Sequence, residues 1–474
     1  MITGRASATP RRRLVSMPAL RISPQLTLAV FALAMAWPQN NVIKGPGGSI
    51  TPARVLAGFC FLWWLVTRLS GGLGLRSGRN PVRGTILLAL GLLLLANGIA
   101  MANGVADAVI SDSDRTMMLL VLLGGTAMLA ADALEGVRAL RIVLGAMVIG
   151  ATMSAFSALV MFVTKFDLRQ FTVLPGLEAQ GILKADLARG GLERALGFAT
   201  HPIELAAIAT AAIPLALHLA RHAGYKPLWW ACVLVLATGP MVAISRTGLL
   251  GMAIIVMLLL PRVRFGPWIL GITGAAVVGG VAALSNPKLA GVLDKTVSGS
   301  KNDSSIGSRL RAYEYVAELV QRNTFGGQGL GTYKAPPQPY LDNQYLLTLV
   351  ESGLLGEIAL IALLVAPVVL MVRVWRGDGV LTARRAELPA TKDAAWAVGT
   401  ALVTCVVSFG TYDALAFPQF EGFTLLLIGL AGAVVAQTLP DAVARVRPVS
   451  HSDVVTTGAV VSPSDRRQVN EVSA

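Results

Sequence analysis

Residues 343–373 read NQYLLTLVESGLLGEIALIALLVAPVVLMVR, and this stretch decides the fold class of the chain. Its only charged side chains are those of Glu351, Glu357 and Arg373. An α-helix needs about 20 consecutive, mostly apolar residues to cross the hydrocarbon core of a bilayer. The stretch therefore predicts a transmembrane helix. The glycines that follow Glu351 predict a bend near the start of this helix. We expect the Glu351 carboxylate to form hydrogen bonds with backbone groups at the bend.

Eleven further apolar stretches repeat this pattern along the chain. The twelve are centred on residues 24–37, 54–68, 84–102, 116–131, 142–163, 202–220, 227–244, 247–260, 266–284, 343–373, 394–411 and 419–437. We therefore predict an all-α polytopic membrane protein of about twelve transmembrane helices. Its transmembrane domain covers residues 21–440, and the polar termini, 1–20 and 441–474, are expected to be disordered cytoplasmic segments.

The composition agrees with this class of protein. The 474 residues are 54% hydrophobic and only 14% charged, whereas soluble domains carry about 25% charged residues. These values exclude a disordered chain and a disulfide scaffold, and they disfavour a soluble enzyme. Cys60, Cys232 and Cys405 lie far apart in apolar stretches, so we expect small core residues rather than bridges. With only four histidines, we expect neither a metal site nor a cofactor.

The net charge of +14 follows a topological pattern. If the N-terminus is cytoplasmic, the majority of the 40 Lys and Arg residues fall in cytoplasmic segments. Cytoplasmic loops of membrane proteins are in general enriched in these two residues. An even number of spans returns the C-terminus to the cytoplasm. Loops 165–200 and 285–341 then lie outside a plasma (inner) membrane. We expect the basic residues to meet anionic membrane lipid and no nucleic acid, because no basic domain is present.

Charged residues and regularly spaced apolar residues in both long outside loops predict some short structure there. Residues 308–320 have helical apolar spacing, and the glycine-rich residues 325–333 are interpreted as a tight bend rather than a phosphate loop. Arg246 lies between two apolar stretches at the outer face. It either reaches toward a lipid headgroup or is buried to bind an anionic ligand. Asp342 precedes an apolar helix and could simply cap its start.

Four motifs occur together in a characteristic order. They are Arg194–Pro202 (RALGFATHP), Ser245–Gly248 (SRTG), the stretch from Arg309 to Tyr333, and Asp342–Gly356, which begins DNQYL. In this order, within a twelve-span chain, they resemble the bacterial O-antigen ligase and O-antigen polymerase superfamily. The resemblance is close over residues 190–360 and extends to the whole chain in span number and orientation.

The resemblance implies a membrane glycosyltransferase with a GT-C-like fold and short helices in its large outside loop. Such enzymes move a glycan from a polyprenyl diphosphate to an acceptor glycan or lipid. Arg246 and Arg309 match arginines beside the diphosphate, and Arg194 is a third candidate. Fixed cations suit a leaving diphosphate, so neither metal nor nucleotide is expected. Substrate contacts of lower rank are Arg311, Tyr313, Asn343 and Glu204, the last of which could pair with an arginine.

The candidate general base departs from the family pattern. Ligases of this family usually carry a histidine where this chain has Asp342, and this difference favours a polymerase or another class of acceptor. A carboxylate among arginines stays ionised and can still accept a proton. His201 is the substitute base, or else a polar residue that starts the helix at Pro202. Asp413 and Glu421 flank the last outside loop and could contact the acceptor.

Two other functions remain open at this point. A polytopic secondary transporter would share the hydropathy profile, although it is expected to show two related halves with broken helices in matching places. A non-catalytic component of a polysaccharide-export system would tolerate changes at its outer arginines.

Overall fold

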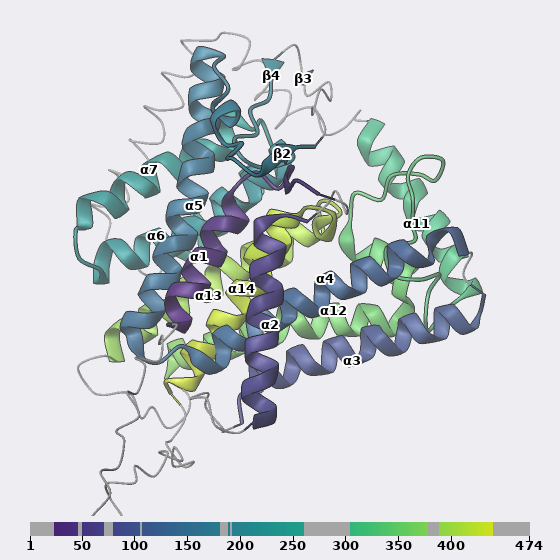
Figure 1. The fold of residues 1–474 in the computed structure, drawn as a ribbon. Helices are drawn as coiled ribbons and strands as arrows, with labels where there is room; N and C mark the ends of the chain where they lie inside the picture. Colours follow the sequence, from purple (N-terminus) through teal and green to yellow (C-terminus); the bar gives the residue numbers. More distant parts are fainter. Residues whose placement is uncertain are drawn as a thin grey trace, which may run out of the picture.

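The structure, a computed structural model, describes residues 23–45, 50–70, 79–104, 107–180, 188–189, 192–259, 304–377 and 388–438. Figure 1 shows helices packed side by side with little sheet. The helices are α1 (Pro24–Ala36), α2 (Pro52–Ser70), α3 (Pro81–Ala102), α4 (Asp107–Ala133), α5 (Gly136–Thr164), α6 (Pro202–His222), α7 (Lys226–Val242), α8 (Arg246–Leu259), α11 (Ser304–Arg322), α12 (Gln344–Arg376), α13 (Leu388–Phe409) and α14 (Pro418–Ala436).

Short elements occupy the first of the long loops. The 3-10 helix η1 (Leu168–Phe171) precedes β2 (Leu177–Ala179), which pairs antiparallel with β1 (Asn41–Ile43). The strands β3 (Ala188–Arg189) and β4 (Leu192–Glu193) form a second antiparallel pair. A further 3-10 helix, η3 (Ala414–Ala416), lies between α13 and α14.

Eleven of the twelve apolar stretches coincide with helices, and the stretch 266–284 lies outside the described residues. Within the described ranges, eight helices are long and apolar enough to cross a membrane, which confirms a multi-pass helical protein. The helices α1, α7 and α8 are apolar but shorter. The total of twelve spans therefore stays a prediction. A turn at Ile244, whose φ of 46° is left-handed, separates α7 from α8.

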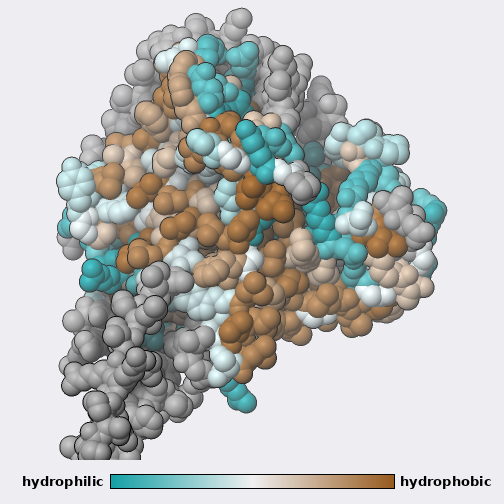
Figure 2. All heavy atoms as spheres, in the orientation of Figure 1, coloured by the Kyte–Doolittle hydropathy of each residue, from teal (hydrophilic) through white to brown (hydrophobic). Residues whose placement is uncertain are grey.

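The helices α6 and α14 form the centre of the bundle. In each of them 94% of the most apolar 18-residue window is buried, compared with 28% in α2 and α3. Large apolar side chains on the outer helices, such as Leu62, Leu88 and Leu95, are more than half exposed. Figure 2 shows apolar residues gathered along α2 and α3, with hydrophilic ones toward α11. Such a surface is stable against lipid tails and not in water.

The longest helix, α12, is interrupted near its start. Gly353 has φ 60° and ψ −160°, a conformation that is essentially restricted to glycine. The glycine-rich bend packs against this break: Gln328 N–H donates to Val350 O (3.0 Å), Gly329 N–H to Glu351 O (2.8 Å), and Leu354 N–H to Thr324 O (2.8 Å). Backbone groups freed by the interruption are thus satisfied by the loop, as burial in a membrane protein requires.

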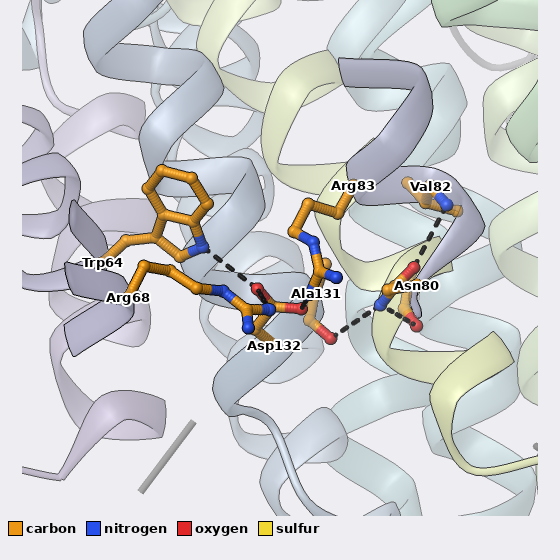
Figure 3. A network of polar contacts seen from close by, with 8 residues as sticks. Trp64, Arg68, Asn80, Val82, Arg83, Ala131 and Asp132 are labelled. Carbon is orange, nitrogen blue, oxygen red and sulfur yellow. Dashed lines mark hydrogen bonds and ion pairs between the residues drawn. The ribbon is translucent and has the colours of Figure 1, made fainter. Parts of the chain in front are cut away.

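A buried aspartate joins three helices at the other end of the bundle. Figure 3 shows Asp132 of α4 accepting hydrogen bonds from Trp64 Nε1 (3.0 Å) and Arg68 (2.7 Å) of α2, and from Arg83 (2.8 Å) of α3. Asn80, which caps α3, donates to the carbonyls of Ala131 (3.1 Å) and Gly432 (3.2 Å). Arg68 and Arg83 are therefore built into the helix packing.

We expect Gly353→Ala to destabilise the protein. A Cβ at Gly353 would lie 2.4 Å from the Phe325 backbone, in a φ region that side chains rarely adopt, so a cost of about 1–3 kcal/mol is expected. The matched control is Gly98→Ala in α3, where a Cβ meets no atom within 4 Å. Thermal unfolding in detergent measures both. Equal melting temperatures for the two variants would contradict the proposed strain at Gly353.

We also expect Asp132→Ala to lower the free energy of unfolding. Removing the buried partner of two arginines costs about 3–5 kcal/mol, and the partial exposure of Arg68 and Arg83 puts this case at the lower end. Glu318→Ala is the control, because its pair with Arg322 is exposed and such pairs contribute at most about 1 kcal/mol. Chemical unfolding followed by tryptophan fluorescence compares them. If Asp132→Ala loses no more unfolding free energy than the control, Asp132 does not join the three helices as described.

Candidate functional site

Four segments that are distant in sequence meet at one end of the bundle. They are residues 194–204, 243–247, 342–345 and 411–421, which we call the helix-end junction. Thr247 Oγ1 donates to Thr411 Oγ1 (3.0 Å), Gln344 N–H donates to Tyr412 O (3.1 Å), and Leu415 N–H donates to Gln344 Oε1 (2.9 Å). The junction contains Arg194, His201, Arg246 and Asp342, all of which the sequence analysis selected.

Arg194 and Arg246 lie on either side of one turn. Arg194 Nε donates to Ala243 O (2.8 Å), and Ala195 N–H donates to Val242 O (3.2 Å), so the segment after β4 is tied to the end of α7. Arg246, half-buried, is the first residue of α8. The N-terminus of a helix carries partial positive charge, which adds to the charge of Arg246. The turn thus has the charge of an anion-binding site.

His201 caps α6 with its ring nitrogen. Its Nδ1 accepts a hydrogen bond from Ile203 N–H (3.1 Å), and its ring contacts Phe417 at 5.7 Å between centroids. Burial and the charge of Arg194 lower the pKa of His201 to about 4. The imidazole is therefore neutral at pH 7, and because Nδ1 is the acceptor, we assign the proton to Nε2. In this tautomer Nε2 is a hydrogen-bond donor, and the lone pair of Nδ1 is already used by Ile203 N–H.

Asp342 is exposed at the start of α12, where it does not act as the cap. The neighbouring Asn343 caps the helix instead, accepting from Tyr345 N–H (3.0 Å) and Leu346 N–H (3.4 Å). Burial, together with the charge of Asp342, raises the pKa of Asp413 to about 6. The two carboxyl groups are therefore neighbours, although 71 positions separate them in sequence.

Glu204 holds the junction together from within. Its carboxylate, fully buried, accepts hydrogen bonds from Thr200 N–H (2.8 Å) and Oγ1 (2.7 Å), and from Gln419 N–H (2.8 Å) and Phe420 N–H (3.1 Å). These donors belong to the loop before α6 and to the start of α14. The expected arginine partner is replaced by backbone groups, because the first N–H groups of α14 need an acceptor.

Glu351 bonds backbone groups at the helix break, as the sequence predicted. Its Oε1 accepts from Tyr333 N–H (3.1 Å) across the glycine-rich bend. Beside this bend lies a polar cavity of about 250 Å³ between the end of α3, the start of α4 and the loop after α11. Amide and hydroxyl side chains dominate its lining: Asn103, Asn323, Gln328, Thr332 and Gln338.

The helix α11 carries the remaining predicted residues. Val316 of α11 packs in one apolar cluster with Leu341 and Val350, so the helix lies against the first turns of α12. Tyr313 is half exposed. Arg309 and Arg311 belong to α11, but their side chains lie outside the described residues.

A separate group of ligand-type side chains lies on α6 and α13. His218 and His222 are four residues apart on α6, a spacing that suits metal binding. Asp393 of α13 lies against both rings, and ligand atoms of the three residues all fall within 4.8 Å of one another. The prediction of no metal site did not take this pair of histidines into account.

The fold defines a multi-pass α-helical membrane protein whose polar residues collect at the ends of its helices. Within it, residues 230–361 match the family model described as O-Antigen ligase. This match supports the resemblance of the chain to the O-antigen ligase and polymerase family. No curated protein matches the chain significantly. The matched range includes Arg246, Arg309 and Asp342, whereas Arg194 and His201 precede it.

The lowered pKa of His201 predicts a pH-dependent stability. The unfolded chain binds a proton at His201 near its ordinary pKa of 6.5, and the folded chain binds it only near 4. The contribution of His201 to the free energy of unfolding is therefore fully present above about pH 6.5 and is lost as the pH falls toward 4. His201→Asn keeps a capping side chain but does not titrate, so its stability should fall less over this range.

The measurement is the unfolding midpoint at pH 7, 6, 5 and 4, with His451→Asn as a control that removes a different histidine. We expect the control to follow the wild-type profile. If His201→Asn also follows it, the histidine is not held neutral in the folded protein.

Proposed function

We propose that this protein transfers a glycan from a polyprenyl diphosphate to an acceptor hydroxyl at the outer face of the plasma (inner) membrane, in cell-surface polysaccharide assembly. The family supports glycan ligation or polymerisation with lipid-linked substrates. The observation that carries the proposal is the helix-end junction, where Arg194 and Arg246 border one turn at the N-terminus of α8 and Asp342 lies on a directly bonded segment.

The chemistry requires charge stabilisation at the leaving group. The acceptor oxygen forms a bond to C1 of the donor sugar while the bond from C1 to the diphosphate oxygen breaks, and its electron pair remains on the diphosphate. This developing negative charge is stabilised by Arg246, Arg194 and the N-terminus of α8. Arg309 of α11 supplies a further positive charge. Direct displacement inverts the configuration at C1. The arginines supply the positive charge without a metal ion in this step.

Asp342 is the base in this proposal. Its exposed carboxylate accepts the proton of the acceptor hydroxyl, and Asp413 lies beside it. His201, whose Nδ1 caps α6, has the role of a hydrogen-bond donor through Nε2. Asn343, as the cap of α12, fixes the segment that carries Asp342.

The substrates and the orientation complete the proposal. The lipid tail of the donor enters between helices from the bilayer, and the glycan occupies the polar side of the outer loops, where the amide-lined cavity offers uncharged hydrogen-bonding groups. The acceptor is a glycan or a lipid. Both termini lie in the cytoplasm, in keeping with the distribution of Lys and Arg.

We expect Arg246→Ala to reduce kcat/KM for glycan transfer by about 10²–10³, the loss typical of removing one group that stabilises a developing anion. Asp342→Asn should reduce it by about 10²–10⁴, as the loss of a general base does. The assay uses purified full-length protein in nanodiscs with a lipid-diphosphate glycan, and it measures both the product and the released polyprenyl diphosphate.

Arg322→Ala is the matched control, because Arg322 is an exposed arginine of α11 paired only locally with Glu318. Wild-type transfer by Arg246→Ala, Arg309→Ala and Asp342→Asn would refute the site. Uptake of a solute into proteoliposomes without release of polyprenyl diphosphate would instead support a transporter. Export that persists with all three variants would support a non-catalytic component.

A further inference from the structure

A second cluster of ligand-type side chains lies at the opposite end of α6. His218 and His222 are one turn apart on α6, and Asp393 is in the second turn of α13. Asp393 Oδ2 lies 2.9 Å from His218 Nδ1 and 3.3 Å from His222 Nε2. Seventeen residues separate His218 from His201, so the cluster is about 25 Å along α6 from the helix-end junction.

These separations match the edges of a metal coordination shell. Zinc bound to His nitrogen and carboxylate oxygen at about 2.0–2.1 Å in a tetrahedron requires ligand atoms roughly 3.3 Å apart. Two of the three separations are 2.9 and 3.3 Å, and all three atoms fall within 4.8 Å of one another.

The surroundings hold the ligands in position and leave access from one side. Arg221 donates to Asp393 Oδ1 at 3.0 Å, which orients the carboxylate and leaves Oδ2 toward the histidines. His218 is fully buried, whereas 26% of the His222 side chain is exposed. The exposed side gives a metal ion an entry path and leaves the fourth position for water.

His218 has a further feature that calls for an explanation. Its Nε2 is buried without a hydrogen-bond partner in the described part of the chain. An unsatisfied buried polar atom costs about 1–3 kcal/mol. The polar contact of the His218 ring within the described residues is therefore the one between Nδ1 and Asp393 Oδ2 (2.9 Å).

We propose that His218, His222 and Asp393 bind one divalent transition-metal cation of the zinc type. Imidazole nitrogen with a carboxylate is a donor set that zinc commonly takes. The ion joins the end of α6 to the start of α13, and its distance from the junction makes it a structural site and not part of glycan transfer. A different arrangement, an ion-pair network of Asp393 with Arg221 and nearby Arg141, needs no metal and is the alternative outcome of the test.

The test measures metal binding directly. Full-length protein carrying an affinity tag without histidine is stripped with chelator, incubated with Zn²⁺ and desalted, and its zinc content is determined by mass spectrometry. We expect about one zinc per chain for the wild type, and at least about tenfold weaker binding for His222→Ala and Asp393→Asn. Co²⁺ in place of Zn²⁺ should give the visible absorption of a tetrahedral site in the wild type and not in His222→Ala or Asp393→Asn.

His451→Ala is the matched control, because it removes a histidine outside the cluster and should bind zinc as the wild type does. Zinc should also raise the melting temperature of the wild type and of His451→Ala, and not that of His222→Ala. The proposal is overturned if the wild type binds no more zinc than His222→Ala. That result would assign the cluster to the ion-pair network with Arg221.

Discussion

The requirement that buried backbone groups find hydrogen-bond partners governs this structure more than any other constraint. Inside a helical bundle without water, each interruption of a helix exposes N–H groups that need acceptors. Two buried glutamates meet this need. Glu204 accepts from the start of α14 and from the loop before α6, and Glu351 accepts from the bend that covers the break in α12. Irregular segments can therefore exist at the end of the bundle that holds the candidate site.

The same constraint explains why the candidate site is built from helix termini. Arg246 begins α8, His201 caps α6, and Asn343 caps α12, so each position is set by the end of a packed helix. A charged group on a helix terminus is fixed by the helix behind it, whereas a long free loop would leave it mobile. The polar groups of the candidate site thus lie where the helices of this bundle end.

Local patterns in the sequence predicted most of the helices, because a span of about 20 apolar residues has few alternatives. They also predicted the backbone role of Glu351, which depends on nearby glycines. Contacts between remote segments were beyond this kind of reasoning. Gln419, one of the partners of Glu204, lies 215 residues away, and Asp393 lies 175 residues from His218. The capping of α12 by Asn343 rather than Asp342 shows a competition between neighbours that only the backbone geometry resolves.

The break at Gly353 divides α12 into unequal parts. The portion after it, residues 354–376, is about 34 Å long at 1.5 Å per residue, which by itself matches the roughly 30 Å hydrocarbon thickness of a bilayer. The nine residues before the break form a separate helical part of about 13 Å. Asp342 directly precedes this part, next to the cap residue Asn343. The break therefore separates a part of α12 that is long enough to cross a bilayer from a short part that leads to Asp342.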